Sequence, residues 1–540
     1  MQLPNRAPRP AARPPLQVVP PSAPDSAGHL STLAYGTLIA GVLLVGLLVR
    51  LSFILSSDFP LNDGGMFFQM VRDLQANHYA LPPTTTYNAA DIPFAYPPLG
   101  FYATALVDDT LPVSLVTAFR VVPFAASALV LCAFMIFARS WCASRAEALV
   151  AGLAFALLPR TYLWLLMGGG ITRAFGLLFA ILALYFIRLL YLRQRLIFAA
   201  PAGIFAALTV LSHLEMAWCV AFTAALFFVA FGRHRTGLLG SALIAVATVV
   251  LTAPWWGTIL VYHGPAPLLN AGHASGPLVL DRVIALLYMR FTGEALFPVL
   301  AALALLGCIA CFARRQYLLP VWLLLTLTLD LRALGTFATL PFALLISHAV
   351  VGALVPAIRG VARAPRALVP AVGIIVGCYA LIAAMVAAPQ LLRAMTPDEQ
   401  SAMAWVAGNT APQSRVLVVA NEAWAADKSS EWLPALTQRI SVATPQGAEW
   451  LPGNAFADRV EAYRALQKCA NGTGDCLDTW ERKFSLPFDY VYIPKINSSL
   501  DEMPVDEHEC CAALRAALRA DPRYRVAFDG AGATIFRRAS

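Results

Sequence analysis

Long apolar runs constrain this chain more than any other feature of its sequence. About eleven runs approach the length that a membrane-spanning helix needs, at roughly 32–55, 113–138, 146–166, 174–192, 196–212, 216–231, 237–256, 294–312, 317–330, 336–356 and 367–388. Hydrophobic residues make up 59% of the 540 residues and charged residues only 13%, about half the charged share of a soluble domain. The sequence therefore predicts a polytopic α-helical membrane protein with about eleven transmembrane helices.

The loops between these runs alternate in charge. Arginines gather in every second loop, at 139–145, 188–195, 233–235, 314–315 and 359–366, whereas the loops at 56–112, 159–173, 212–215, 257–293 and 330–335 are poorer in basic residues. Because cytoplasmic loops carry an excess of Lys and Arg, this pattern predicts a cytoplasmic N-terminus and an extracytoplasmic C-terminus. The net charge of +8 is explained by these loops, so we expect no nucleic-acid partner.

Composition divides the chain into three parts. Residues 1–29 are rich in Pro and Ala, which predicts a disordered cytoplasmic tail. Residues 30–390 form the predicted transmembrane domain, whose first outer loop, 56–112, is far longer than two neighbouring helices need. Residues 391–540 have the pattern of an extracytoplasmic soluble α/β domain, with strands predicted at 416–420, 490–493, 525–528 and 533–536 and helices beginning at 397 and spanning 456–468 and 506–520.

Four of the ten cysteines lie in this C-terminal region. Cys469 and Cys476 enclose a turn-rich segment, and we expect them to form a disulfide in an oxidising compartment. Cys510 and Cys511 are adjacent, and neighbouring cysteines do not easily bond each other. The other six lie in or beside apolar runs without the paired spacing of a zinc site.

Asp63, in the first outer loop, is the strongest candidate for chemistry. It follows the first apolar run by a few residues and precedes two glycines, which allow close approach of another backbone. A carboxylate here could accept a proton from an acceptor hydroxyl or bind a divalent cation, either Mg²⁺ or Mn²⁺. The structural alternative is that Asp63 caps a helix that begins near Met66.

Other polar groups lie at the outer ends of later runs. Three glycines precede Arg173, so the start of this helix could bind a lipid phosphate, or could simply be a tight turn with an interfacial arginine. His213 and Glu215 join two spans, where ionisable groups are candidates for function unless they lie at the water boundary. Arg332 could hold a phosphate or pair with nearby Asp330.

Two short motifs in the first outer loop, Asn-Asp-Gly at 62–64 and Tyr-Pro-Pro-Leu at 96–99, resemble the membrane glycosyltransferases of the GT-C superfamily. The predicted architecture, with a long first outer loop, many spans and an outer C-terminal domain, is similar to that family too. The chain lacks the paired Asp-Glu that several members carry after the first helix. It also lacks the Trp-Trp-Asp-Tyr-Gly motif of oligosaccharyltransferases.

The resemblance implies transfer of a sugar, with inversion, from a polyprenyl-phosphate donor to an acceptor at the outer face of a bacterial cytoplasmic membrane. It implies that Asp63 is the base or a metal-site residue, with Asp73 or Asp91 as a second carboxylate. By the same comparison, Arg173 and Arg332 would hold the donor phosphate. The aromatic first loop, including Tyr96, would seat the lipid or the sugar.

Two other classes of protein fit the apolar runs. A transporter or flippase of lipid-linked saccharides is expected to carry polar or broken helices near the bilayer midplane and often two similar halves. The candidate polar groups instead gather at the outer boundary, and no two halves of the chain are alike. A non-catalytic membrane assembly protein, whose outer domain binds a partner, is also compatible with the spans.

Overall fold

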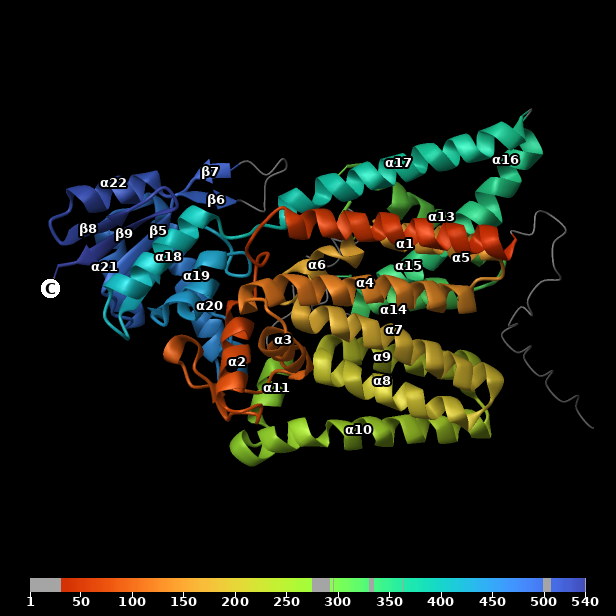
Figure 1. The fold of residues 1–540 in the computed structure, drawn as a ribbon, viewed down its shortest axis with the longest axis horizontal. Helices are drawn as coiled ribbons and strands as arrows, with labels where there is room; N and C mark the ends of the chain where they lie inside the picture. Colours follow the sequence, from red (N-terminus) through yellow and green to blue (C-terminus); the bar gives the residue numbers. More distant parts are fainter. Residues whose placement is uncertain are drawn as a thin grey trace, which may run out of the picture.

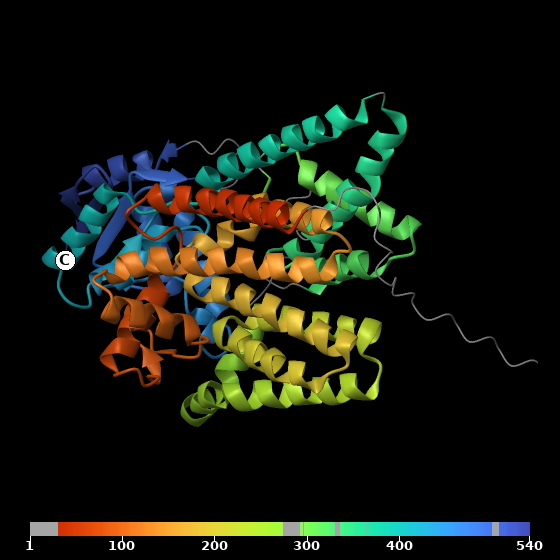
Figure 2. The same cartoon turned by 45° about the vertical axis from the view of Figure 1, so that its right-hand side comes forward.

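The computed structural model describes residues 31–273, 292–294, 296–329, 335–362, 364–498 and 507–539. A bundle of apolar helices forms most of it, and a mixed β-sheet with its own helices lies at one end of the bundle (Figures 1 and 2). The predicted tail at 1–29 and the candidate Arg332 lie outside the described residues.

Seven of the described helices are long and apolar enough to cross a membrane, or eight if one bent pair counts as a single span. They cover Thr32–Leu55 (α1), Leu115–Trp141 (α4), Gly170–Arg193 (α7), Leu214–Gly232, Arg235–His263 (α10), Thr339–Val361 and Pro365–Val386. The span Leu214–Gly232 consists of α9 (Leu214–Phe227) and a π-helical end, and Thr339–Val361 extends from α15 (Thr339–Ala349) to α16 (Val355–Val361). Pro365–Val386 lies within α17 (Pro365–Leu391). Shorter apolar helices cover Leu196–Ser212 (including α8, Ala199–Ser212), Val299–Ala313 (α13) and Leu318–Leu329 (α14). The predicted polytopic helical architecture is therefore confirmed.

The apolar run predicted at 146–166 is broken. Its two halves, Arg145–Leu157 (α5) and Pro159–Leu166 (a 3-10 turn followed by α6, Leu163–Leu166), meet at 79°. Leu158 at the break has an extended backbone, with φ −68° and ψ 115°. The residue before a proline is disfavoured in the helical region, so Pro159 accounts for the break.

Arg50 of α1 is a fully buried charge that the sequence analysis missed. Its guanidinium donates hydrogen bonds to the Ala156 carbonyl (3.1 Å), the Ser127 hydroxyl (3.1 Å) and the Thr161 hydroxyl (3.3 Å). It also lies 4.9 Å from the ring centre of Tyr162. Because polar groups inside a bilayer must be satisfied by the protein, we interpret Arg50 as the donor that satisfies the Ala156 carbonyl at the α5 break.

The long first loop is ordered and connects the bundle to the sheet. It contains α2 (Gly65–Ala76), the paired strands β1 (Thr84–Thr85) and β2 (Ile92–Pro93), and α3 (Leu99–Thr110). α3 packs against α4 and α7, whereas α2 packs against α19 (Lys428–Thr437) of the C-terminal region. Figure 1 shows α2 and α3, with α11 (Ala266–His273), at the junction of bundle and sheet.

The C-terminal sheet has five strands in the order β4-β3-β5-β9-β8. β3 (Arg415–Val418) is parallel to β4 (Ile440–Ser441) and β5 (Tyr490–Pro494), and β9 (Ala533–Arg538) is antiparallel to β5 and β8 (Tyr524–Asp529). The four strands predicted from the sequence are confirmed. The helices of this region are α18 (Pro397–Asn409), α19, α20 (Ala455–Gln467), α21 (Gly474–Phe484) and α22 (Ala512–Ala520).

Alternate residues of the central strands face two different layers. Val416 and Val418 of β3 belong to the apolar cluster that includes α2 and α19. Leu417 belongs to the cluster formed with α20, α21 and α22. This period of two follows from the pleat of a strand, and it places one face of the sheet against the first loop.

The helix predicted at 506–520 was wrong at its start. Glu507–Glu509 form a strand, β7, which pairs antiparallel with β6 (Ile496–Ser498), and α22 begins only at Ala512. Cys511 has a φ of 58°, in the left-handed region that a helix cannot continue through. The apolar spacing that suggested a longer helix is contained in α22 alone.

Both cysteine pairs of this region are disulfides in the structure. Cys469 and Cys476, with Cα atoms 5.7 Å apart, join a 3-10 turn to α21. Cys510 and Cys511 are also joined, contrary to the expectation that adjacent cysteines would remain apart. The left-handed turn at Cys511 between β7 and α22 brings their side chains together.

Candidate functional site

The backbone beside Asp63 is held by three segments that are distant in the sequence. The Gly168 N–H donates to the Leu61 carbonyl (2.8 Å), and the Asn62 N–H donates to a carbonyl of the segment before α18 (2.6 Å). The indole N–H of Trp432, on α19, donates to the Asn62 carbonyl (2.9 Å). Bundle and C-terminal region together therefore fix the position of the next residue, Asp63.

Both carboxylate oxygens of Asp63 have partners at the start of α7. Oδ1 accepts the backbone N–H of Gly169 (3.0 Å), and Oδ2 forms an ion pair with the Arg173 guanidinium. The guanidinium carbon lies 4.5 Å from the ring centre of Trp164, so the arginine is held from two sides. The Asp63 side chain is 21% exposed and that of Arg173 is 13% exposed. The helix end predicted to hold a phosphate thus binds a carboxylate of the protein itself.

Glycines allow this close approach of the first loop to α7. A Cβ on Gly168 would lie 2.0 Å from the Asp63 carbonyl oxygen, and one on Gly64 would lie 3.0 Å from the Gly168 Cα. Gly64 also has a φ of 122°, which side chains of L-residues rarely permit. The Gly-Gly-Gly segment and the Asn-Asp-Gly motif are therefore two halves of one contact.

Gly168→Ala is expected to destabilise this contact by about 1–3 kcal/mol, the usual cost of overpacking. Thermal unfolding of the purified protein in detergent should show the loss as a lower midpoint. Gly41→Ala on α1 is the matched control, because a Cβ there meets nothing within 4 Å. Equal midpoints for the two variants would contradict the tight contact.

Glu431 of α19 is a second carboxylate at the site, and it is only 7% exposed. Its Oε1 accepts the backbone N–H of Gly64 (2.8 Å), the residue that caps α2, so Asp63 itself is not the cap. Burial, reinforced by the negative charge of Asp63, raises the pKa of Glu431 to about 8, although Arg173 and the Gly64 N–H act in the opposite direction. The sequence analysis missed Glu431, which lies 367 positions from Gly64 and belongs to no local motif.

Tyr96 and His213 lie near Arg173, and Glu215 lies near Tyr96. The Tyr96 ring meets the His213 ring edge-on with centres 6.4 Å apart, and the His213 ring meets that of Trp164 at 5.6 Å. Burial raises the pKa of Tyr96 to about 12, with Glu215 adding to the effect and Arg173 opposing it. These candidates, drawn from separate loops of the sequence, are therefore neighbours of the Asp63–Arg173 pair.

The other two carboxylates proposed for this loop have different surroundings. Asp73 is buried and accepts hydrogen bonds from the hydroxyls of Thr85 and Thr86 (both 2.6 Å) and from the Gln69 amide (2.9 Å). These bonds tie β1 to α2, which is a structural role. Asp91 is exposed in the turn before β2, with a φ of 50°.

The predicted divalent cation, Mg²⁺ or Mn²⁺, stays a prediction. Among the residues that the structure describes, no group of three or more His, Cys, Asp or Glu side chains is arranged to hold a metal ion. Both oxygens of Asp63 already have partners, and the Arg173 charge beside them repels a second cation.

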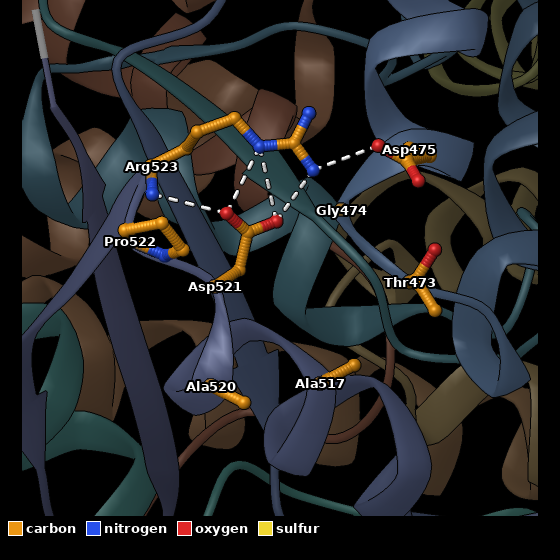
Figure 3. A pocket seen from close by; sticks show the side chains of 8 residues that line it. All are labelled: Thr473, Gly474, Asp475, Ala517, Ala520, Asp521, Pro522 and Arg523. Atoms are coloured by element: carbon orange, nitrogen blue, oxygen red, sulfur yellow. Dashed lines mark hydrogen bonds and ion pairs between the residues drawn. The ribbon is translucent and has the colours of Figure 1, made fainter.

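A separate polar pocket of about 500 Å³ lies in the C-terminal region, lined by Thr473, Gly474, Asp475, Ala517, Ala520, Asp521, Pro522 and Arg523. Figure 3 shows Arg523 between two carboxylates of this pocket. It pairs with Asp521 (2.5 Å) and Asp475 (2.8 Å), so carboxylates of the pocket already balance its charge. An exposed network of this kind is weak evidence for a ligand site.

No family model and no curated protein matches this sequence. Solved structures do match its fold. ArnT from Cupriavidus metallidurans bound to undecaprenyl phosphate has a TM-score of 0.55 and 15% identity, over 94% of this chain and 99% of that chain. The Archaeoglobus fulgidus oligosaccharyltransferase in the apo form has a TM-score of 0.54 and 14% identity, over 86% of this chain and 70% of that chain.

The arabinofuranosyltransferase AftD from Mycobacteria is also similar, with a TM-score of 0.56 and 17% identity, over 95% of this chain and 40% of that chain. All three are GT-C glycosyltransferases. The chain has the GT-C fold. The match to ArnT covers 94% of the chain, so the resemblance to GT-C glycosyltransferases seen in the sequence is confirmed. The archaeal GT-C enzyme has also been solved in complex with Zn and sulfate.

Proposed function

We propose that this protein transfers a sugar from a polyprenyl-phosphate donor to an acceptor at the outer face of a bacterial cytoplasmic membrane. The observation that carries the proposal is the Asp63–Arg173 pair at the junction of the bundle, the first loop and the C-terminal sheet. The similar ArnT was solved bound to undecaprenyl phosphate, which is a polyprenyl phosphate. A glycosyl donor on such a lipid suits a site next to membrane-spanning helices.

The proposed topology has eleven spans, a cytoplasmic N-terminus and an extracytoplasmic region from 391 to 540. The support is the alternation of Arg-rich loops. A single reactive cysteine placed at exposed Asn471 should label in intact cells, and one at exposed Arg233 only after lysis. Labelling of both positions from the same side would contradict this topology.

The transfer uses the Asp63–Arg173 pair as a base and its counter-ion. The acceptor hydroxyl oxygen bonds to the anomeric carbon while the bond from that carbon to the donor phosphate oxygen breaks. The phosphate leaves with the electron pair, and Asp63 takes the acceptor proton. Attack on the face opposite to the phosphate inverts the anomeric centre.

Arg173 balances a negative charge both before and after the proton transfer. Before transfer, its positive charge is balanced by ionised Asp63. When Asp63 becomes protonated, the same guanidinium is available to neutralise the additional negative charge on the leaving phosphate. The helix end and its arginine can therefore bind phosphate even though Asp63 occupies them in the resting site.

A transfer assay separates this proposal from transport. Protein reconstituted in vesicles with membrane acceptors and a labelled polyprenyl-phosphate sugar should yield a labelled covalent product and free polyprenyl phosphate. Movement of the labelled lipid across the vesicle without any covalent product would instead indicate a flippase. Absence of both would favour a non-catalytic assembly protein.

A further inference from the structure

We propose that Glu431 is a positioning residue of the transfer site, supplied by the C-terminal region, and that its ionisation controls donor binding. This inference rests on the proposed function. It assigns to the α/β region the positioning of Asp63 at the junction of bundle and sheet.

Consecutive residues of α19 hold the backbone on both sides of Asp63. Trp432 donates its indole N–H to the Asn62 carbonyl (2.9 Å), and Glu431 accepts the Gly64 N–H (2.8 Å). A Cβ on Gly65 would lie 2.4 Å from the Glu431 carbonyl oxygen, so α2 and α19 are in close backbone contact here. Asp63 can therefore change position only if this contact with the C-terminal region opens.

Three further hydrogen bonds fix α19 in this position. Asp427 caps the helix by accepting the Ser430 N–H (2.9 Å), and the Tyr463 hydroxyl donates to Asp427 (2.7 Å). The Tyr87 hydroxyl, from the first loop, donates to the Glu431 carbonyl (2.7 Å). The backbone of Glu431 is therefore fixed, and its carboxylate reaches the Gly64 N–H at the start of α2.

Two carboxylates, Asp63 and Glu431, therefore lie near the same arginine, Arg173. Asp63 is paired with Arg173, and no ion pair formed by Glu431 is found among the described residues. Other charged groups near α19 have partners of their own: Arg72 donates to the Ala435 carbonyl, Lys428 pairs with Glu399, and Asp73 accepts from Thr85 of β1. The acidic side chains of Asp427 and Glu449 and the neutral hydroxyl of Tyr87 also lie nearby. Ionisation of Glu431 therefore adds a negative charge to this part of the site.

This charge count predicts a pH dependence. Because burial raises the pKa of Glu431 to about 8, the group is mostly neutral at pH 7 and ionises as the pH passes 8. The anionic donor phosphate then meets a second negative charge beside Asp63. At pH 9 only about a tenth of the Glu431 side chains stay protonated if the group titrates near 8. The donor KM of the wild-type protein should therefore rise by about tenfold between pH 7 and pH 9.

Glu431→Gln tests the role of the charge, because the amide oxygen can still accept the Gly64 N–H but cannot ionise. The donor KM of this variant should stay the same between pH 7 and pH 9, whereas that of the wild-type protein rises. Glu461→Gln is the chemically matched control, at an exposed carboxylate paired with Lys483. It should keep the wild-type pH profile.

Glu431→Ala tests positioning, because it removes the acceptor altogether. Amide hydrogen exchange at the start of α2, from Gly64 to Phe68, should be faster in this variant and unchanged in Glu431→Gln. A wild-type pH profile in Glu431→Gln, or unchanged exchange in a folded Glu431→Ala, would overturn the inference. If Glu431→Ala does not fold, the Glu431→Gln profile decides. A wild-type protein without any transfer would contradict the proposed function instead, whereas the exchange measurement would still test positioning.

Discussion

Asp63→Asn is expected to lower kcat for sugar transfer by about 100- to 10,000-fold, the range that a positioned general base contributes. The asparagine carbonyl can still accept the Gly169 N–H, so the loop should keep its place against α7. It cannot accept the proton of the acceptor hydroxyl, and it cannot balance the charge of Arg173. The loss should therefore appear mainly in kcat.

The measurement is transfer from a labelled polyprenyl-phosphate sugar, at matched protein abundance. Asp58→Asn is the control, because Asp58 is an exposed carboxylate of the same loop. It should retain wild-type activity. Full activity in Asp63→Asn would remove Asp63 from the mechanism.

Much of the bundle could be predicted because its signal is local. An apolar run of sufficient length specifies a membrane-spanning helix whatever lies around it, so most of the predicted runs reappear as apolar helices. Two local signals were not used. Pro159 inside the run at 146–166 marks the 79° break, and Arg50 is a lone charge inside the first apolar run.

The candidate site could be predicted only in part. Asp63 and Arg173 were selected on separate grounds, one as a carboxylate after the first span and the other as a cation at a glycine-rich helix start. Their pairing depends on Leu61 lying against Gly168, a contact between segments about a hundred residues apart. No local pattern encodes such a contact.

Glu431 was still harder to predict from the sequence. It joins the site because one face of the C-terminal sheet packs α19 against α2, which is a property of the assembled fold. The error at β7 has the opposite cause. There a helical spacing was read from local residues, and strand pairing with β6 outweighed it.

Arg173→Ala is expected to raise the donor KM by roughly ten- to a hundredfold, which corresponds to the loss of a charge-assisted phosphate contact of about 1.5–3 kcal/mol. Lysine at this position should recover part of the affinity, because it keeps the charge but lacks the planar fork of the guanidinium. We also expect kcat to fall in the alanine variant, since the leaving phosphate then has no counter-charge when Asp63 takes the proton.

Initial rates over a range of donor concentrations separate these two effects. Arg193→Ala, at the exposed far end of α7, is the matched control and should leave the donor KM unchanged. The decisive comparison is between the KM and kcat of Arg173→Ala. A lower kcat with an unchanged KM would mean that Arg173 acts only through Asp63. Wild-type values of both, at normal abundance, would make the arginine an interfacial anchor, and the donor phosphate would then have to be sought at His213 or Arg332.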